Sequence, residues 1–194
     1  MKFIDLFAGL GGFHQALEQL GHECVFASEL NSDLAVLHKT NFGIMPAGDI
    51  RNVAPACIPD HDILCAGFPC QPFSKAGEQK GFECPQWGDL FCFIIQILMA
   101  KRPQYLIIEN VPNLVRHDEG QTWKNILHRL RVAGYSVDDG RISPHDLGIP
   151  QKRERAFIVG SRSNLGDFSW PARAKGNSTD ISSVLDQHPD DAKL

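Results

Sequence analysis

Cys70 lies where a catalytic nucleophile would be expected. It follows the apolar run 63–66 in the stretch Gly-Phe-Pro-Cys-Gln-Pro. Pro69 fixes its own φ angle and Pro72 restricts Gln71 to extended conformations, so the thiol is predicted to lie on a preformed loop. A loop that leaves the carboxyl end of a strand opens onto the ligand crevice of an α/β sheet. Taken alone, a Pro-Cys-Gln triplet is more often structural than catalytic, so the rest of the chain has to decide.

A carboxylate and two arginines also border predicted strands. Glu109 directly follows the apolar run 105–108, where it is either capped by backbone groups or held for a function. Arg153 and Arg155, in Gln-Lys-Arg-Glu-Arg, are two residues apart and lie on the same side of an extended segment. Such a pair could clamp a carboxylate, a phosphate or a base edge, and its alternative is a solvated charge run.

The segment 3–12, Phe-Ile-Asp-Leu-Phe-Ala-Gly-Leu-Gly-Gly, predicts a strand, a glycine-rich turn and then a helix. Such a turn lets a ligand approach the backbone at a helix N-terminus, although it could also be a tight packing turn. Glu29, about twenty positions on at the end of the next strand, is placed to bind ribose hydroxyls. The final spaced glycine of the dinucleotide fingerprint is missing. The predicted ligand is therefore a nucleoside with a short charged tail in preference to one with a pyrophosphate. Asp49, in Gly-Asp-Ile, is a further acidic candidate or an ordinary turn residue.

Strand and helix patterns alternate along the chain. Short apolar runs predict strands at 2–7, 23–28, 63–66, 105–108 and 156–160. Helical spacing predicts helices at 13–20, 32–40, 89–100 and 122–133, the first with Phe13, Ala16, Leu17 and Leu20 facing inward and the second capped by Asn31 or Ser32. Continuously apolar strands between amphipathic helices indicate an α/β fold with a doubly wound, mostly parallel sheet covered on both faces.

Composition limits the class of protein. The 194 residues, 43% of them hydrophobic, are enough for one domain with a real core, and the chain turns polar from about residue 161. A net charge of −4 without a basic tract argues weakly against a chain that grips nucleic acid on its own. No window holds the roughly 18 apolar residues of a membrane span, and no signal peptide is recognised. Six cysteines without a Cys-x-x-Cys pair indicate reduced thiols in a cytosolic protein, with no metal site expected.

Four motifs in order give the chain a specific resemblance. They are Asp-Leu-Phe-Ala-Gly-Leu-Gly-Gly at 5–12, Gly-Phe-Pro-Cys-Gln-Pro-Phe-Ser at 67–74, Glu-Asn-Val at 109–111 and Gln-Lys-Arg-Glu-Arg at 151–155. Together they resemble the catalytic region of a DNA cytosine-5 methyltransferase, up to about Trp170. The resemblance implies a methyltransferase of a restriction-modification system, with a Rossmann-like fold, acting on DNA in the bacterial cytosol or nucleoid.

The resemblance also implies the roles of the catalytic residues. Cys70 is similar to the nucleophile that adds to C6 of a flipped cytosine. Glu109 resembles the residue that hydrogen-bonds N3 and the exocyclic amine. Arg155, with Arg153 beside it, resembles the arginine that engages the base carbonyl or the nucleophile loop.

The implied cofactor is S-adenosylmethionine, with S-adenosylhomocysteine as product. By resemblance, Phe13 stacks on the adenine, Glu29 binds the ribose, Asp49 and Ile50 contact the adenine, and Leu90 lines the pocket. The other predicted contacts are Phe7, Ala8, Gly9, Gly11, Gly12, Leu30, Gly67 and Pro69. Two departures are visible: Leu30 stands where relatives often have an aromatic residue, and Cys-Pro-Gln-Trp at 84–87 replaces a more polar stretch.

The family's target-recognition region and its terminal Gly-Asn-Ser helix do not follow, and the Gly-Asn-Ser at 176–178 lacks helical context. We therefore expect residues 1–160 to be the catalytic and cofactor-binding domain and 161–194 a polar tail leading toward an absent recognition region. Three interpretations stay open: an excised fragment or one subunit of a split enzyme whose partner recognises double-stranded DNA, an inert cofactor-binding fragment, or an RNA-directed cytosine-5 methyltransferase.

Overall fold

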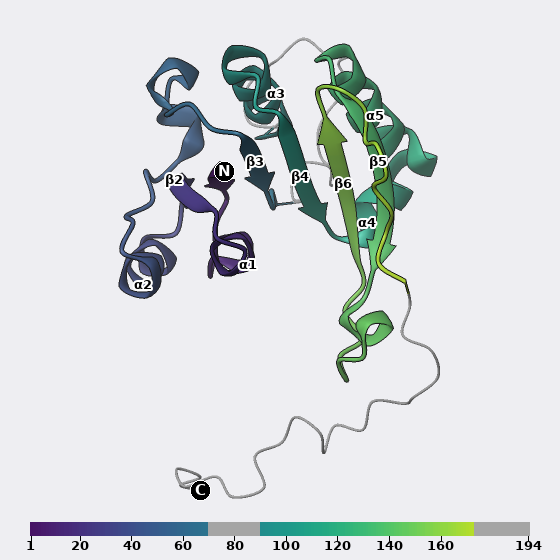
Figure 1. Ribbon diagram of the computed structural model, residues 1–194, viewed down its shortest axis with the longest axis horizontal. Helices are drawn as coiled ribbons and strands as arrows, with labels where there is room; N and C mark the ends of the chain where they lie inside the picture. The colour runs from purple at the N-terminus through teal and green to yellow at the C-terminus, as the bar shows by residue number, and fades with distance from the viewer. Residues whose placement is uncertain (70–89, 173–194) are drawn as a thin grey trace, which may run out of the picture.

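The computed structural model describes residues 1–69 and 90–172, which form a single six-stranded sheet flanked by helices (Figure 1). The strands are β1 (Lys2–Leu6), β2 (Glu23–Ser28), β3 (Ile63–Ala66), β4 (Tyr105–Asn110), β5 (Ser136–Ile142) and β6 (Arg155–Ser161), in the spatial order β2-β1-β3-β4-β6-β5. Strands β2, β1, β3 and β4 pair in parallel, whereas β6 is antiparallel to both of its neighbours. The predicted α/β, mostly parallel fold is confirmed.

The helices are α1 (Gly12–Gln19), α2 (Ser32–Phe42), α3 (Leu90–Lys101), α4 (Pro112–Arg116) and α5 (Gln121–Val132). Short 3-10 turns lie at Ile50–Asn52, Pro55–Cys57, His117–Gly120 and Pro144–Leu147. The cap of α2 is Asn31, as expected, because its side chain accepts hydrogen bonds from the backbone N–H groups of Asp33 (2.9 Å) and Leu34 (3.1 Å). No helix in the described part of the chain is long and apolar enough to cross a membrane.

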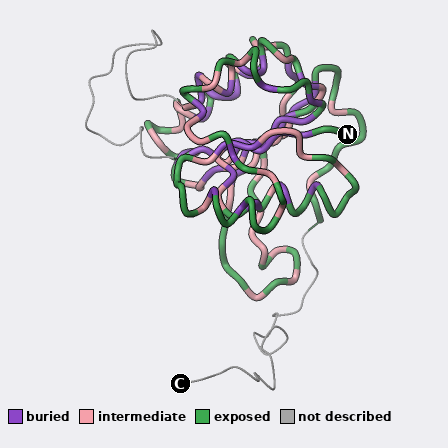
Figure 2. The backbone as a smooth tube through the Cα atoms, turned by 90° about the vertical axis from the view of Figure 1, so that its left-hand side faces the viewer, coloured by how far each residue is buried: buried purple, intermediate pink, exposed green. Residues whose placement is uncertain are grey.

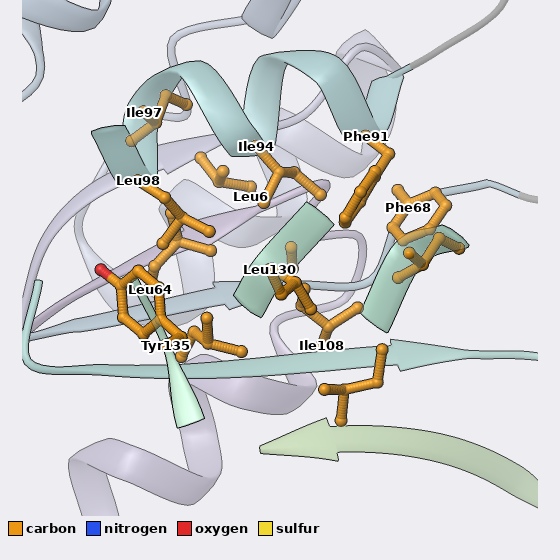
Figure 3. Close-up of a cluster of buried hydrophobic side chains, with 14 of the residues drawn as sticks. Leu6, Leu64, Phe68, Phe91, Ile94, Ile97, Leu98, Ile108, Leu130 and Tyr135 are labelled. Carbon is orange, nitrogen blue, oxygen red and sulfur yellow. The ribbon is translucent and has the colours of Figure 1, made fainter. Parts of the chain in front are cut away.

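One face of the sheet carries most of the core. Alternate residues of β1, β3 and β4 point to this face, among them the fully buried Leu6, Leu64 and Ile108. They pack against Ile94 of α3 and Leu130 of α5 (Figure 3). The tube in Figure 2 shows buried stretches running through the middle of the molecule and exposed stretches around its outside. This layer supports the carboxyl ends of β3 and β4, where the candidate site begins.

The opposite face holds a smaller cluster under α1. It consists of Phe3, Leu17, Ile63 and Cys65, with Phe13 packed partly buried at its side. The buried side chains of α1 are Leu17 and His14, so the prediction that Ala16 and Leu20 face inward is wrong, and Leu20 is 72% exposed. The buried stripe is rotated because His14 has a partner inside: its Nδ1 lies 3.2 Å from His38 Nε2 of α2.

Residues 162–172 run back along β5. The Ser136 hydroxyl donates to the backbone oxygen of Ser163 (2.8 Å), and farther along the strand Trp170 Nε1 donates to Asp138 Oδ2 (3.1 Å). Gly140 is required at this point, because a Cβ there would lie 2.7 Å from the Trp170 ring. The segment therefore travels from the amino edge of the sheet toward its carboxyl edge, as the yellow-green trace in Figure 1 shows. The boundary at residues 160 and 161 stays a prediction.

Candidate active site

The glycine loop that follows β1 is held by the acidic end of β2. The Gly9 N–H donates to Glu29 Oε2 (2.8 Å), and the other oxygen, Oε1, accepts from the Asn31 N–H (2.9 Å). Phe7 and Gly9 both have positive φ angles, 60° and 54°, so the loop turns sharply away from the sheet. The structure therefore brings Gly9 together with Glu29, and the roles of Phe7, Ala8 and Gly9 in cofactor binding stay predictions.

The next two glycines differ in their surroundings. Gly11 has φ +83°, and a Cβ there would lie 2.2 Å from Phe42 Cε2, so this glycine packs directly on the end of α2. Gly12, at the start of α1, has no described heavy atom within 4 Å of its Cβ position. Gly11 thus has the role of a packing turn, whereas Gly12 leaves room for a ligand. Phe13 is half-buried beside this space.

The other predicted cofactor contacts differ in exposure and in hydrogen bonding. Arg51 Nε donates to both carboxylate oxygens of Asp49 (2.9 Å each), and this hydrogen bonding lowers the Asp49 pKa. Ile50 is 3% exposed and belongs to the main core, while Leu30 is 70% exposed. Leu90 is half-buried at the first turn of α3. The structure thus places Asp49 in an ion pair of its own and Ile50 beneath the surface.

The predicted catalytic carboxylate and arginine meet at the carboxyl edge of the sheet. Arg155 Nε lies 2.8 Å from Glu109 Oε1, and the two side chains are 20% and 28% exposed. Burial raises the pKa of Glu109, and the positive charges of Arg155 and Arg153 oppose the shift. A Cβ on Gly67 would lie 3.4 Å from Glu109 Oε2, so the backbone that leads toward Cys70 passes close to this carboxylate.

Cys70 itself lies outside the described residues, and Pro69, the last residue before it, is exposed. Arg153 is exposed as well, and its backbone N–H donates to the Ser143 hydroxyl (3.2 Å). Ser143 also forms a reciprocal capping box with Asp146. The hydrogen bonds of Ser143 hold the start of β6 in place, and with it the direction of Arg155.

Three buried polar features of the site region were not predicted. Asn110, beside Glu109, is 3% exposed and hydrogen-bonded at both ends of its amide. Asp5 of β1 is 1% exposed, and neither of its oxygens accepts a hydrogen bond of good geometry; burial raises its pKa to about 8, and the nearby His14 backbone amide offsets part of that rise. The third feature is the pair His14 and His38. Of these features only Asp5 gave a signal in the sequence, as a carboxylate inside an otherwise apolar strand.

Solved structures of methyltransferases share this fold. Dnmt2 methyltransferase of S. pombe superposes with a TM-score of 0.74 at 24% identity, over 96% of this chain and 61% of that one. EhMeth of Entamoeba histolytica, also a methyltransferase, gives a TM-score of 0.69 at 18% identity, over 96% and 60%. At these identities the likeness concerns the fold.

The sequence comparisons give the family. The model of the C-5 cytosine-specific DNA methylases matches residues 1–193, so the chain belongs to that family. The type II methyltransferase M.MspI of Moraxella sp is 45% identical over 185 residues, which are 95% of this chain and 44% of the relative. M.HhaI of Haemophilus parahaemolyticus is 46% identical over 173 residues, 88% of this chain and 53% of the relative. The chain thus spans about half the length of these relatives.

S-adenosylmethionine is the cofactor of this family, and the site region fits it. The open space beside Gly12 lies at a helix N-terminus, and Glu29 provides carboxylate oxygens that can accept hydrogen bonds from ribose hydroxyls. The half-buried ring of Phe13 offers a surface for a base. When bound, the cofactor supplies an electrophilic methyl group.

Proposed function

We propose that this chain is the catalytic and cofactor-binding part of a DNA cytosine-5 methyltransferase, in which Cys70 attacks a flipped cytosine. The ion pair of Glu109 and Arg155 beside the Gly67 turn carries the proposal. It brings the carboxylate that we assign to base recognition close to the backbone that leads to Cys70.

The chemistry explains why a thiol is needed. C5 of cytosine is a poor nucleophile, and addition of the Cys70 thiolate to C6 converts the ring into an enamine whose C5 can attack an electrophilic methyl group. Loss of the C5 proton and expulsion of the thiolate then restore the aromatic ring and the free enzyme. A stacked base cannot be reached in this way, so the cytosine has to leave the duplex at a cost of a few kcal/mol.

Glu109 suits the recognition of the base. A carboxyl group whose pKa is raised by burial can share a proton with N3 while its second oxygen accepts from the exocyclic amine. Arg155 keeps the carboxyl group oriented through the 2.8 Å contact of its Nε. Its planar guanidinium has further N–H groups that can reach the base carbonyl.

DNA is the substrate that the comparisons favour, because type II methyltransferases are about 45% identical to this chain. The solved methyltransferase structures are similar at 24% identity or less, which concerns the fold and does not distinguish DNA from RNA. Because the chain spans about half of its relatives, we propose that target recognition comes from further polypeptide, in cis or as a partner. We place the assembled enzyme in the bacterial cytosol, with the host DNA.

Trapping on duplex DNA that contains 5-fluorocytosine tests the proposal. The chain is incubated with S-adenosylmethionine, alone and with a polypeptide that spans the part of M.HhaI lacking a counterpart here. We expect a covalent adduct in the complemented mixture, abolished by Cys70→Ser and retained by Cys57→Ser, which changes an exposed free cysteine. An adduct that persists in Cys70→Ser, or none in the complemented wild type, refutes the covalent mechanism. Preference for transfer RNA over duplex DNA would refute the substrate.

A further inference from the structure

Asn110, the last residue of β4, uses both ends of its side-chain amide inside the protein. Nδ2 donates to the backbone oxygen of Phe68 (2.8 Å), and Oδ1 accepts from the N–H of Val111 (2.9 Å). The orientation of the amide is therefore fixed, since the reverse orientation would set donor against donor and acceptor against acceptor.

The contact begins where the β3–β4 ladder ends. Strands β3 and β4 are paired up to Ala66 and Ile108, and the backbone at Phe68 has already left the sheet. Strand β4 continues for two more residues because β6 holds it, with Asn110 opposite Ala156. Asn110 thus lies at a strand end that β6 holds in place. Its side chain reaches the segment 67–69, which is no longer hydrogen-bonded to β4 within the sheet.

The segment 67–69 makes few other hydrogen bonds among the described residues. The Gly67 N–H donates to the Leu6 oxygen at 3.3 Å, and Pro69 has no N–H to donate. The Phe68 ring is 4% exposed and packs in the core, but a ring contact leaves the direction of its carbonyl open. The shorter bond from Asn110 fixes that carbonyl, and with it the plane of the peptide that joins Phe68 to Pro69.

Side chains alternate along a strand, so Glu109 and Asn110 leave β4 toward opposite faces. Glu109 meets Arg155 on one face, and Asn110 meets Phe68 on the other. We propose that Asn110 is a positioning residue of methyl transfer: its carboxamide orients the backbone that enters Cys70 relative to the Glu109 carboxylate. This inference rests on the function proposed above.

A positioning role and a merely structural role differ in their response to Asn110→Asp. The two side chains have nearly the same shape, but an ionised carboxylate cannot donate to the Phe68 oxygen. A protonated one can, through its O–H, while its other oxygen still accepts from Val111. The hydrogen bond is therefore lost at high pH and regained as the pH falls.

The test measures kcat and the KM for S-adenosylmethionine between pH 6 and pH 9 in the complemented enzyme. We expect Asn110→Asp to lower kcat at least about tenfold at pH 9, with KM within about twofold, and to approach the wild type toward pH 6. Asn110→Leu should be impaired at every pH, which separates the lost hydrogen bond from an effect of negative charge. The control is Gln104→Glu at the opposite end of β4, which makes the same chemical change next to Ser161 and Ser163 and should leave kcat unchanged.

Thermal unfolding accompanies each variant, and Asn110→Leu provides the comparison if the aspartate variant unfolds at pH 9. Wild-type kcat in Asn110→Asp at pH 9, or in Asn110→Leu at any pH, overturns the positioning role. Equal, pH-independent losses in both variants also overturn it. If the complemented wild type itself forms no adduct, the proposed function fails instead, so the two failures are distinguishable.

Discussion

Replacing Gly11 and Gly12 separately by alanine tests whether the glycine loop is a packing turn, a ligand site or both. In Gly11→Ala, an L-residue in the left-handed region costs about 1–2 kcal/mol. The new Cβ would also lie 2.2 Å from Phe42 Cε2, and such overpacking adds about 1–3 kcal/mol. The loss of about 2–5 kcal/mol should lower the Tm by roughly 5–15 °C.

Gly12→Ala should behave in the opposite way. Its Cβ meets no described atom within 4 Å, and alanine at the start of a helix is neutral or stabilising by at most about 1 kcal/mol. We expect an unchanged or slightly higher Tm, together with at least about tenfold weaker binding of S-adenosylmethionine, because the methyl group fills the space assigned to the ligand. Scanning calorimetry and isothermal titration calorimetry give the two quantities. Equal Tm losses in the two variants refute the packing analysis, and unchanged cofactor affinity in Gly12→Ala refutes the ligand space.

Three further predictions concern the charged groups. Glu29→Ala should abolish detectable S-adenosylmethionine binding in calorimetry, because the Gly9 and Asn31 amides lose their acceptor, whereas Glu23→Ala at the start of β2 should bind normally. The folded-state pKa of Asp5 is raised to about 8, so its stabilising contribution is present at low pH and is lost as the pH rises toward 8. Urea titrations should show the free energy of unfolding of the wild type falling by about 1 kcal/mol between pH 7 and pH 8. The same measurement on Asp5→Asn should show no such fall. Burial lowers the pKa of His14 and of His38, so the free energy of unfolding should decrease as the pH falls below about 6.5. In His38→Gln this decrease should be smaller.

The sequence was sufficient to place two strands. The strands at 23–28 and 63–66 were predicted to the residue, because each is a short, mostly apolar run. Strand β5 was missed, since Asp138, Asp139 and Gly140 are typical of a turn. In the structure the two carboxylates accept hydrogen bonds from the indole N–H groups of Trp170 and Trp123, partners that are distant in sequence.

At the site, too, contacts between residues distant in sequence were beyond prediction. Glu109 could be assigned to the carboxyl edge, because parallel strands all end there. Its contact with Arg155 depends on the reversal of β6, which brings the beginning of that strand to the same edge and which apolar runs alone do not encode. Asn110 belongs to the Glu-Asn-Val motif, but its residue type and position give it no role, since its bond to Phe68 follows from how β3 and β4 diverge. Roles that depend on the course of the backbone do not follow from residue types and spacing alone.

The return of residues 162–172 along β5 has a consequence for attaching other polypeptides. Trp170 stacks over Gly140, whose partner in β6 is Phe157, two residues from Arg155. The amino terminus lies at the opposite rim, about 17 Å away if the five residues of β1 are fully extended. A DNA-reading module tethered after residue 172 would therefore start near the Glu109–Arg155 ion pair at a high effective concentration, and the same module joined before Met1 would first have to cross the depth of the sheet.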